Sequence, residues 1–269
     1  MTDLESHTNL EGHVALVTGA SRGIGAAVAC AFANAGASVV LAARDADALE
    51  RLVVELKASG AEAAAVPTDV SDEPAVTRLV EETLTRFGRL DFACNNAART
   101  AGPPPTPLAD LDLEAFDASV AVNLRGVFLG LKYEIAAMLA AGGGGAIVNM
   151  SSTAGIHGVA GLAPYVSTKY GIEGLTRVAA LDYARHNIRV NAIAPGPILT
   201  DHLERAGADA QHHAAAAMPI GRIGQPQEVA AAVVWLCSDA AAFVTGTTLV
   251  IDGGQLAGTP PFVMQPRSQ

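Results

Sequence analysis

The feature that most constrains this chain is a glycine-rich turn between a short apolar run and an alanine-rich segment. The apolar run Val14–Val17 is typical of a buried strand, and Gly23–Ala35 is typical of a helix. Gly19 lies between the two segments, and Gly23 and Gly25 lie at the start of the predicted helix. Glycine lets the backbone turn tightly and approach a phosphate without a Cβ in the way, and the following helix offers its N-terminus to an anion. The segment therefore predicts a strand–turn–helix unit that cradles a pyrophosphate.

Strand-like and helix-like segments alternate along the rest of the chain. Apolar runs predict further strands at Ser38–Ala42, Ala63–Val66, Leu90–Cys94, Ala146–Met150, Ile188–Ile193 and Thr247–Ile251. Helical periodicity predicts further helices at Ala46–Ser59, Glu73–Phe87, Leu113–Ala140, Tyr165–Ala184 and Gln227–Cys237. This alternation predicts an α/β fold of the Rossmann type, a doubly wound, seven-stranded parallel sheet with helices on both faces. No linker interrupts it, so we expect residues 1–269 to form a single domain with short tails.

Several local expectations accompany this pattern. Ser71 is a plausible N-cap for the helix Glu73–Phe87, which carries a proline in its first turn. The proline-rich stretch Arg99–Pro107 predicts a loop, and Pro195–Arg222 is expected to be irregular or weakly helical. The tail from Gly258 onward is expected to be poorly ordered on its own.

Composition excludes several classes of function. The net charge of −10 argues against a nucleic-acid partner, which requires a basic face. No run of about 18 apolar residues is present, so we expect no membrane-spanning helix. The first ten residues contain acidic side chains and no apolar stretch, so no signal peptide is expected and a cytoplasmic location is predicted.

No metal site is expected. The cysteines lack the spacing of a metal or redox motif, and the histidines of the segment Asp201–Pro219 have no suitably spaced carboxylate or cysteine to complete a zinc site. These residues are Cys30, Cys94, Cys237, His202, His212 and His213. We expect buried reduced thiols and solvated histidines.

Three side chains predict chemistry at a carbonyl or alcohol carbon. Tyr165 and Lys169 are four residues apart and therefore share one face of a helix, and Ser152 precedes the tyrosine by thirteen residues. The ordinary tyrosine pKa of about 10 is too high for easy proton exchange near neutrality. A nearby ammonium group and an oxidised nicotinamide ring both favour the phenolate and should lower this pKa. Tyr165 is then expected to be the acid in reduction and the base in oxidation, with Ser152 holding the substrate oxygen. With the pyrophosphate cradle, this set predicts a nicotinamide-dependent oxidoreductase.

The motifs together resemble the short-chain dehydrogenase/reductase family, in its classical branch. The resemblance is carried by the glycine spacing, by Asn95-Asn96-Ala97, by Ser152 and by Tyr165 with Lys169, and it covers about residues 10–254. The first two glycines are separated by three residues and not by one as in the usual dinucleotide fingerprint. The family usually has glycine after Asn-Asn-Ala, and here Ala98 is expected to crowd the cofactor ribose slightly without abolishing binding.

The resemblance implies roles for further residues. It makes Asn123 a fourth catalytic residue that bends its helix and holds a water leading protons to Lys169. It implies that Asn95 braces the sheet and that Asp201–Pro219 forms a lid over the substrate. The cofactor-binding residues it implies, with those of the glycine turn, are Gly19, Ser21, Arg22, Gly23, Ile24, Gly25, Arg44, Asp69, Val70, Asn96, Tyr165, Lys169, Pro195, Gly196, Ile198 and Thr200.

NADP(H) is predicted over NAD(H). An acid at the end of the second strand would bind the ribose 2′-hydroxyl and repel a 2′-phosphate, but the expected position is Ala43. Arg44 follows it, and Arg22 with Ser21 can reach the same place from the glycine turn, which makes a good phosphate site. The neighbouring acidic residue Asp45 argues mildly for NAD(H).

Three functions remain open at this stage. The first is reversible hydride transfer between the nicotinamide and a small-molecule ketone or secondary alcohol. The second is a ketoreductase of the 3-oxoacyl-(acyl carrier protein) type, ranked lower because Met138–Ala146 has no Lys or Arg and Leu181 stands where a carrier-binding arginine is expected. The third is a non-catalytic NADP-binding protein, ranked lower because Tyr165 and Lys169 are both present.

His157 is a candidate residue for the wall of the substrate pocket. The resemblance also implies a homo-oligomer, with a tetramer preferred over a dimer. The segments Gln227–Cys237 and Thr247–Gly254 are expected to form its subunit interface.

Overall fold

The computed structural model describes residues 9–99 and 104–258. The part of the expected proline loop at 100–103 and the expected tail beyond Gly258 lie outside the described residues. Among the described helices, none is both long enough and apolar enough to cross a membrane.

Seven parallel strands form one sheet in the order β3-β2-β1-β4-β5-β6-β7, which confirms the predicted fold class. The strands are β1 (Val14–Thr18), β2 (Ser38–Ala43), β3 (Ala63–Pro67), β4 (Phe92–Asn95), β5 (Gly145–Met150), β6 (Ile188–Pro195) and β7 (Thr248–Ile251). The order reverses between β1 and β4, so the chain leaves β1 toward one edge of the sheet and returns toward the other. In open parallel sheets, ligands bind at this reversal, outside the carboxyl ends of the strands.

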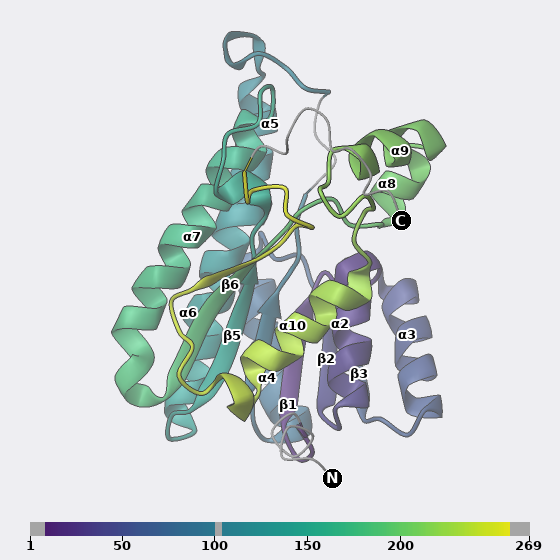
Figure 1. The fold of residues 1–269 in the computed structure, drawn as a ribbon. Helices are drawn as coiled ribbons and strands as arrows, with labels where there is room; N and C mark the ends of the chain where they lie inside the picture. The colour runs from purple at the N-terminus through teal and green to yellow at the C-terminus, as the bar shows by residue number, and fades with distance from the viewer. Residues whose placement is uncertain (1–8, 100–103, 259–269) are drawn as a thin grey trace.

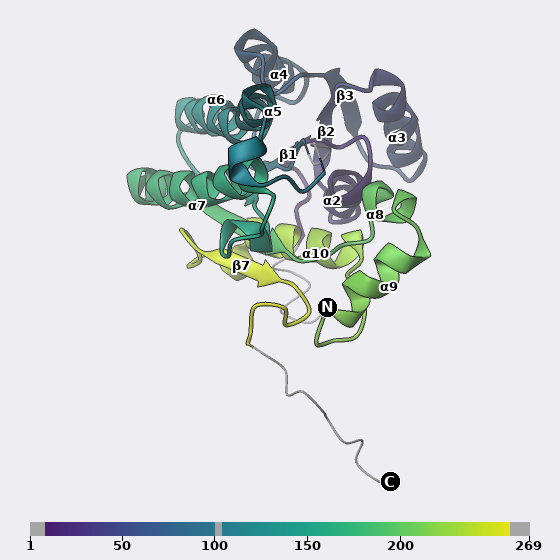
Figure 2. The same cartoon turned by 90° about the horizontal axis from the view of Figure 1, so that it is seen from above.

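Helices cover both faces of the sheet, as Figures 1 and 2 show. Helices α2 (Gly23–Asn34), α3 (Ala46–Ala58) and α10 (Pro226–Cys237) pack on one face. Helices α4 (Glu73–Phe87), α6 (Gly126–Ala140) and α7 (Ala163–Tyr183) pack on the other.

The two covered faces explain why the strands are apolar throughout. Ala15 and Val17 of β1 belong to the core beneath α2, α3 and α10, whereas Val14 and Leu16 belong to the core beneath α4, α6 and α7. Successive side chains point to opposite faces, so a central strand needs apolar residues at every position when both faces are covered.

Two local predictions are wrong in detail. Ser71 does not cap α4: the N-cap is Asp72, whose carboxylate accepts a hydrogen bond from Ala75 N at 3.2 Å. The expected single helix Leu113–Ala140 is divided into α5 (Leu113–Ser119), a π-helical turn (Val120–Arg125) and α6. Asn123 lies in that turn, where the family resemblance implied a bend.

The segment after β6 is more helical than predicted. It forms α8 (Asp201–Arg205) and α9 (Ala208–Ala216), which Figure 2 shows beside the N-terminal end of α2. Both helices therefore lie near the carboxyl ends of the central strands.

Candidate active site

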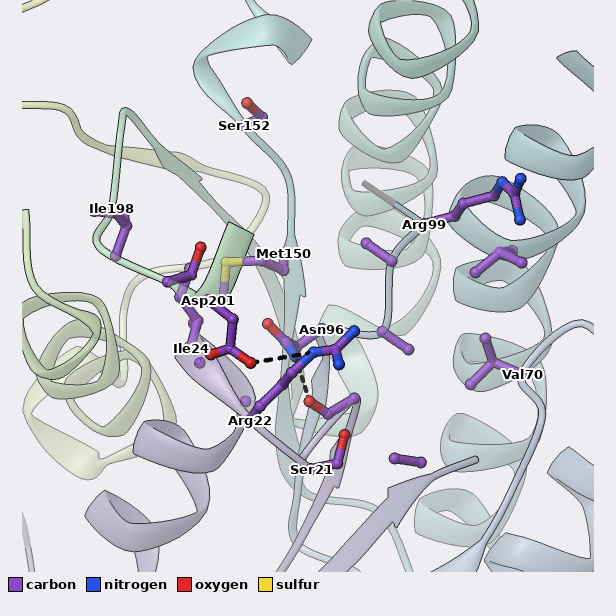
Figure 3. A pocket seen from close by; sticks show the side chains of 18 of the residues that line it. Ser21, Arg22, Ile24, Val70, Asn96, Arg99, Met150, Ser152, Ile198 and Asp201 are labelled. Atoms are coloured by element: carbon purple, nitrogen blue, oxygen red, sulfur yellow. Dashed lines mark hydrogen bonds and ion pairs between the residues drawn. The ribbon is translucent and has the colours of Figure 1, made fainter. Parts of the chain in front are cut away.

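A cavity of about 600 Å³ lies at the carboxyl ends of the strands where the sheet order reverses. Of the predicted site residues, all but Asn123 line it: Gly19, Ser21, Arg22, Gly23, Ile24, Gly25, Arg44, Asp69, Val70, Asn96, Ser152, Tyr165, Lys169, Pro195, Gly196, Ile198 and Thr200. Residues that follow the first six strands thus meet Tyr165 and Lys169 of α7 in one cavity, part of which Figure 3 shows.

The glycine turn is built so that its backbone can come close to a ligand. Gly19 has φ +68, in the left-handed region that favours glycine. A Cβ on Gly25 would lie 2.2 Å from the Gly19 carbonyl oxygen, so no side chain fits there. Asn96 fixes the turn from the neighbouring loop: its Nδ2 donates to Thr18 O at 3.0 Å and to Gly19 O at 3.3 Å.

The N-terminus of α2 opens into the cavity beside this turn. The N-cap is Arg22, and its side chain makes no capping hydrogen bond, so the first amide groups of the helix are free for a ligand. The helix dipole and these N–H groups favour an anion. The glycine cradle and the free helix end together fit the pyrophosphate of a dinucleotide.

Side chains at the end of β2 and β3 form the other side of the cavity. Arg44 is exposed and close enough to Asp69 to affect it: the hydrogen bond from Ser71 mainly lowers the pKa of Asp69, and the charge of Arg44 lowers it further. Asp45, the residue that weakened the NADP prediction, uses its carboxylate to cap α3, accepting from Ala48 N at 3.0 Å.

Ser152, Tyr165 and Lys169 come together at the end of β5. Ser152 lies close enough to Tyr165 to lower the pKa of the phenol, and the Lys169 Nζ lies 5.5 Å from the centre of the Tyr165 ring. Lys169 donates to the Met150 carbonyl oxygen at 2.7 Å and is only 2% exposed. The three groups can therefore act together on one oxygen atom in the cavity.

The expected lowering of the Tyr165 pKa involved both Lys169 and a bound oxidised nicotinamide ring, and for the protein with that ring it stays a prediction. Burial raises the pKa of Tyr165, and the hydrogen bond from Ser152 opposes this in part. Burial also lowers the pKa of Lys169 to about 8, while the negative charge of Glu173 acts in the other direction. Desolvation disfavours the charged form of each group, and in the protein without cofactor it is the largest influence on both pKa values.

Asn123 is fully buried behind the cavity. Its Oδ1 accepts from Arg99 N at 2.7 Å, and its Nδ2 donates to Arg99 O at 3.3 Å and to Ser119 Oγ at 3.2 Å. Nδ2 also lies 3.5 Å from Thr168 Oγ1, on the helix that carries Lys169. The side chain thus holds the loop after β4 in place, and the predicted proton path through it remains a prediction.

Helix α8 reaches the cavity from above the glycine turn. The carboxylate of Asp201 lies 3.8 Å from the Arg22 side chain, and Figure 3 shows the two pointing toward one another. Arg205 from the same helix also lines the cavity. In the described part of the chain, no group of three or more His, Cys, Asp or Glu side chains is placed to bind a metal ion, and His212 and His213 are exposed on α9.

Sequence reasoning missed several residues of the cavity wall: Ala43, Asp45, Thr68, Ala97, Ala98, Arg99, Val122, Met150, Ser151, Asp201 and Arg205. Most of them are adjacent in sequence to predicted site residues, and this adjacency could have identified them. Asp201 and Arg205 fall within the segment Asp201–Pro219 that was expected to cover the substrate, and helix α8 brings both to this cavity. His157, the candidate pocket wall, does not line the cavity, and its ring bonds Thr153 O at 2.8 Å.

Three comparisons place the chain among known proteins. Residues 19–255 match a family model described as enoyl-(acyl carrier protein) reductase. The chain is 48% identical over 248 residues to an A-factor type γ-butyrolactone 1′-reductase (1S-forming) of Streptomyces virginiae, covering 91% of this chain and 96% of that protein. It is 45% identical over 251 residues to a 2,5-dichloro-2,5-cyclohexadiene-1,4-diol dehydrogenase of Sphingobium indicum, covering 92% and 98%. A short-chain type dehydrogenase/reductase from Mycobacterium marinum superimposes with a TM-score of 0.89 at 34% identity, covering 94% of this chain and 99% of that one.

Proposed function

The chain belongs to the short-chain dehydrogenase/reductase family of oxidoreductases, and we propose from this premise that it interconverts a small-molecule ketone and secondary alcohol with NADP(H). The observation that carries the proposal is the meeting of Ser152, Tyr165 and Lys169 in the same cavity as the glycine cradle. A fold of this kind serves many reactions, so the argument rests on that site.

The proposed roles follow from the chemistry of each group. The dinucleotide, when bound, supplies a hydride to the carbonyl carbon or accepts one from the alcohol carbon. Tyr165 donates its phenolic proton to the carbonyl oxygen in reduction and takes the proton back in oxidation. Ser152 donates a hydrogen bond that steadies the same oxygen, and the Lys169 ammonium stabilises the phenolate that Tyr165 becomes. Asn123 supports this set through the loop after β4.

The preference for NADP(H) is supported by the charges at one end of the cavity. Arg22 and Arg44 both line it, and guanidinium groups bind phosphate with two parallel hydrogen bonds. The position where an acid would repel the 2′-phosphate is Ala43, and the nearby carboxylate of Asp45 faces the amide of Ala48 at the start of α3. Neither of these features favours NAD(H).

Ring-shaped substrates are the class we propose first. The two relatives named above are a reductase of a γ-butyrolactone and a dehydrogenase of a cyclohexadiene diol. Both names describe small rings that carry an alcohol or carbonyl, and this chain covers nearly all of each protein. We extend that substrate class to this chain.

A second candidate is reduction of an acyl group carried on an acyl carrier protein. The description of the matching family model favours it. Against it stands Leu181, which is 82% exposed on α7 where a cation for the acidic carrier was expected. We therefore rank this function below the reduction of free small molecules.

We also propose a homo-oligomer in the cytoplasm. The described surface of α10, β7 and the turn between them exposes large apolar side chains, including Trp235, Phe243 and Val250. Exposed apolar patches of this kind mark contact surfaces, and a tetramer is the state that the family resemblance predicted. The three cysteines are free thiols, which fits a reducing compartment.

The decisive experiment is a substrate screen with purified protein and either NADPH or NADH. The panel contains cyclic ketones, lactone ketones, linear ketones and a 3-oxoacyl group on carrier protein, and the reaction is followed by the absorbance of the reduced cofactor. We expect the fastest oxidation of NADPH with cyclic ketones. Tight binding of NADPH with no turnover of any carbonyl would instead identify a non-catalytic binding protein.

A further inference from the structure

A buried carboxylate with no part in the proposed reaction lies one helical turn beyond Lys169. Tyr165, Lys169, Glu173 and Arg177 follow one another at intervals of four residues, so they lie along one side of α7. Glu173 is only 3% exposed. Burying a charged carboxylate is costly unless partners compensate, so its presence there calls for an explanation.

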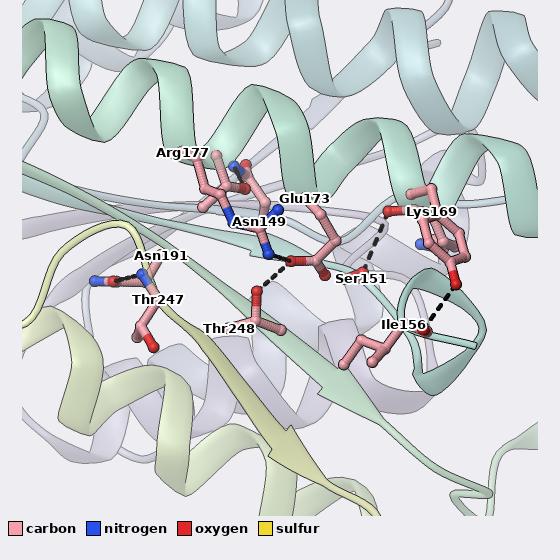
Figure 4. Close-up of polar contacts among 11 residues, drawn as sticks. Asn149, Ser151, Ile156, Lys169, Glu173, Arg177, Asn191, Thr247 and Thr248 are labelled. Atoms are coloured by element: carbon pink, nitrogen blue, oxygen red, sulfur yellow. Dashed lines mark hydrogen bonds and ion pairs between the residues drawn. The ribbon is translucent and has the colours of Figure 1, made fainter. Parts of the chain in front are cut away.

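The direct contacts of Glu173 do not satisfy both of its oxygen atoms. Thr248 of β7 donates its hydroxyl to Oε2, and Figure 4 shows this contact from β7 to α7. The Nη2 of Arg177 lies 3.8 Å from the same oxygen, and that guanidinium is 62% exposed at the surface. Oε1 is buried and has no hydrogen-bond partner in the described residues. Oε1 of the buried carboxylate is thus left without a hydrogen-bond donor among the described residues.

The ammonium group of Lys169 lacks hydrogen-bond acceptors. It can donate three hydrogen bonds, and among the described residues only the Met150 carbonyl accepts one. Lys169 is buried, and burial lowers its pKa to about 8, close to neutrality, while the charge of Glu173 raises it. Glu173 is the acidic residue one turn away from Lys169 on the same helix, and both side chains are buried.

Other charged groups on the surrounding elements are placed differently. Arg177 lies on the far side of Glu173, and Glu134 of α6 is bonded to Asn95 and not to α7. Asp252, after β7, uses its carboxylate to accept from Gly254 N and Leu256 N. Among the groups that the structure describes, burial lowers the Lys169 pKa and the charge of Glu173 raises it.

We propose that Glu173 is a positioning residue for the reaction: its buried charge keeps Lys169 in the ammonium form beside Tyr165. Thr248 holds the carboxylate in place from β7. The proposal rests on the proposed function for the role of Lys169, but the interaction between the two side chains can be measured without any turnover.

Lysine NMR gives that measurement directly, because the chain has only three lysines, Lys57, Lys132 and Lys169. With lysine labelled at the ε-carbon, each ammonium group gives one signal that shifts as it loses its proton, and Lys169→Met assigns the buried one. We expect Glu173→Gln to move the Lys169 titration to lower pH by about one unit, as loss of a nearby opposite charge does. Glu134→Gln is the matched control: it also neutralises a buried glutamate and should leave the titration unchanged.

Two further variants keep the test decisive. Glu173→Asp retains the charge and moves it away by one methylene, so it should shift the titration less than Glu173→Gln, and it serves alone if the glutamine variant does not fold. Thr248→Val removes the bond to β7 but not the charge. If Thr248→Val shifts the Lys169 titration as much as Glu173→Gln does, or if neither Glu173 variant shifts it, the role is structural and the proposal is overturned.

The pH dependence of kcat then links the residue to the reaction. As pH rises through the Lys169 pKa the ammonium charge is lost, and stabilisation of the Tyr165 phenolate is lost with it. Glu173→Gln should make kcat fall at a pH lower by about the same unit as in the NMR titration. If no substrate is turned over, the proposed function fails, and the NMR titration still decides the role of Glu173.

Discussion

The carboxylate of Asp201 lies 3.8 Å from the guanidinium of Arg22, so helix α8 brings a negative charge directly to a proposed phosphate-binding residue. Both side chains are partly exposed, at 43% and 66%. An exposed ion pair is weak, about 0.2–1 kcal/mol, so a cofactor phosphate can displace it. The contact means that Arg22 is shared between the helix and the proposed cofactor site.

Replacing Asp201 by asparagine should therefore tighten the binding of NADPH. The expected gain is up to about fivefold in Kd, because it cannot exceed the strength of an exposed ion pair. Fluorescence titration with NADPH measures it. Asp209→Asn removes a carboxylate from the exposed surface of α9 and should change nothing; weaker binding in Asp201→Asn would show that Asp201 supports the cofactor site.

Replacing Arg44 by alanine should weaken NADPH much more than NADH. Loss of a charge-assisted hydrogen bond costs about 1.5–3 kcal/mol, which corresponds to a rise of roughly 10- to 150-fold in the KM for NADPH. Steady-state kinetics with both cofactors measure the difference. Arg51→Ala, on the exposed surface of α3, is the control for the change in net charge. Equal losses with the two cofactors would contradict a role in binding the 2′-phosphate.

Removal of the Tyr165 hydroxyl should abolish turnover and leave cofactor binding intact. Tyr165→Phe keeps the ring beside Lys169 but cannot donate a proton, so we expect kcat to fall by about 10²- to 10⁴-fold. Tyr133→Phe removes a hydroxyl that bonds Glu73 far from the cavity and serves as the control. Both variants should bind NADPH like the parent, and turnover of Tyr165→Phe near the parent rate would exclude the proposed acid.

Two glycines should respond oppositely to the same substitution. Gly25→Ala places a methyl group 2.2 Å from the Gly19 carbonyl, so it must displace the glycine turn, and NADPH binding should be lost or greatly weakened. Gly174→Ala lies on the exposed side of α7 with open space around the new methyl group, and should raise stability by about 0.5–1 kcal/mol. Binding assays and thermal unfolding of the two variants separate the effects.

Glu134 should make the stability of the protein depend on pH. It is fully buried, Asn95 donates to it at 2.9 Å, and burial raises its pKa from 4.5 to about 7. The folded state therefore holds this proton more tightly than the unfolded state does. Stability from this group is present below about pH 4.5 and is lost as pH rises to about 7, a total of roughly 3 kcal/mol.

Glutamine at position 134 cannot lose a proton, so Glu134→Gln should match the parent at about pH 4 and exceed its stability at about pH 8. Urea unfolding across this range measures the difference. Glu81→Gln, on the exposed side of α4, should show no such pH dependence. A constant difference between Glu134→Gln and the parent at every pH would mean that the buried carboxyl does not titrate in this range.

The fold and most of the candidate site could be predicted because their signals are local. The apolar strand Val14–Thr18 and the glycines that follow it define a unit whose geometry depends on neighbouring residues only. Tyr165 and Lys169 share a helix face because the helix repeat alone brings them together. Boundaries were less certain: α7 begins at Ala163, and the capping role given to Ser71 belongs to Asp72, because several residues near a helix start can accept the same amide hydrogen bond.

The sequence by itself determined the alternation of strands and helices, the phosphate cradle and the tyrosine–lysine pair. Tertiary structure decided which distant groups meet: Arg22 with Asp201, Asn123 with the backbone of Arg99, and Glu173 with Thr248. It also decided how far water is excluded from Tyr165 and Lys169, and this burial is the main cause that raises the pKa of the tyrosine in the protein without cofactor. Contacts and desolvation arise from packing between elements far apart in the chain, and no local pattern contains that information.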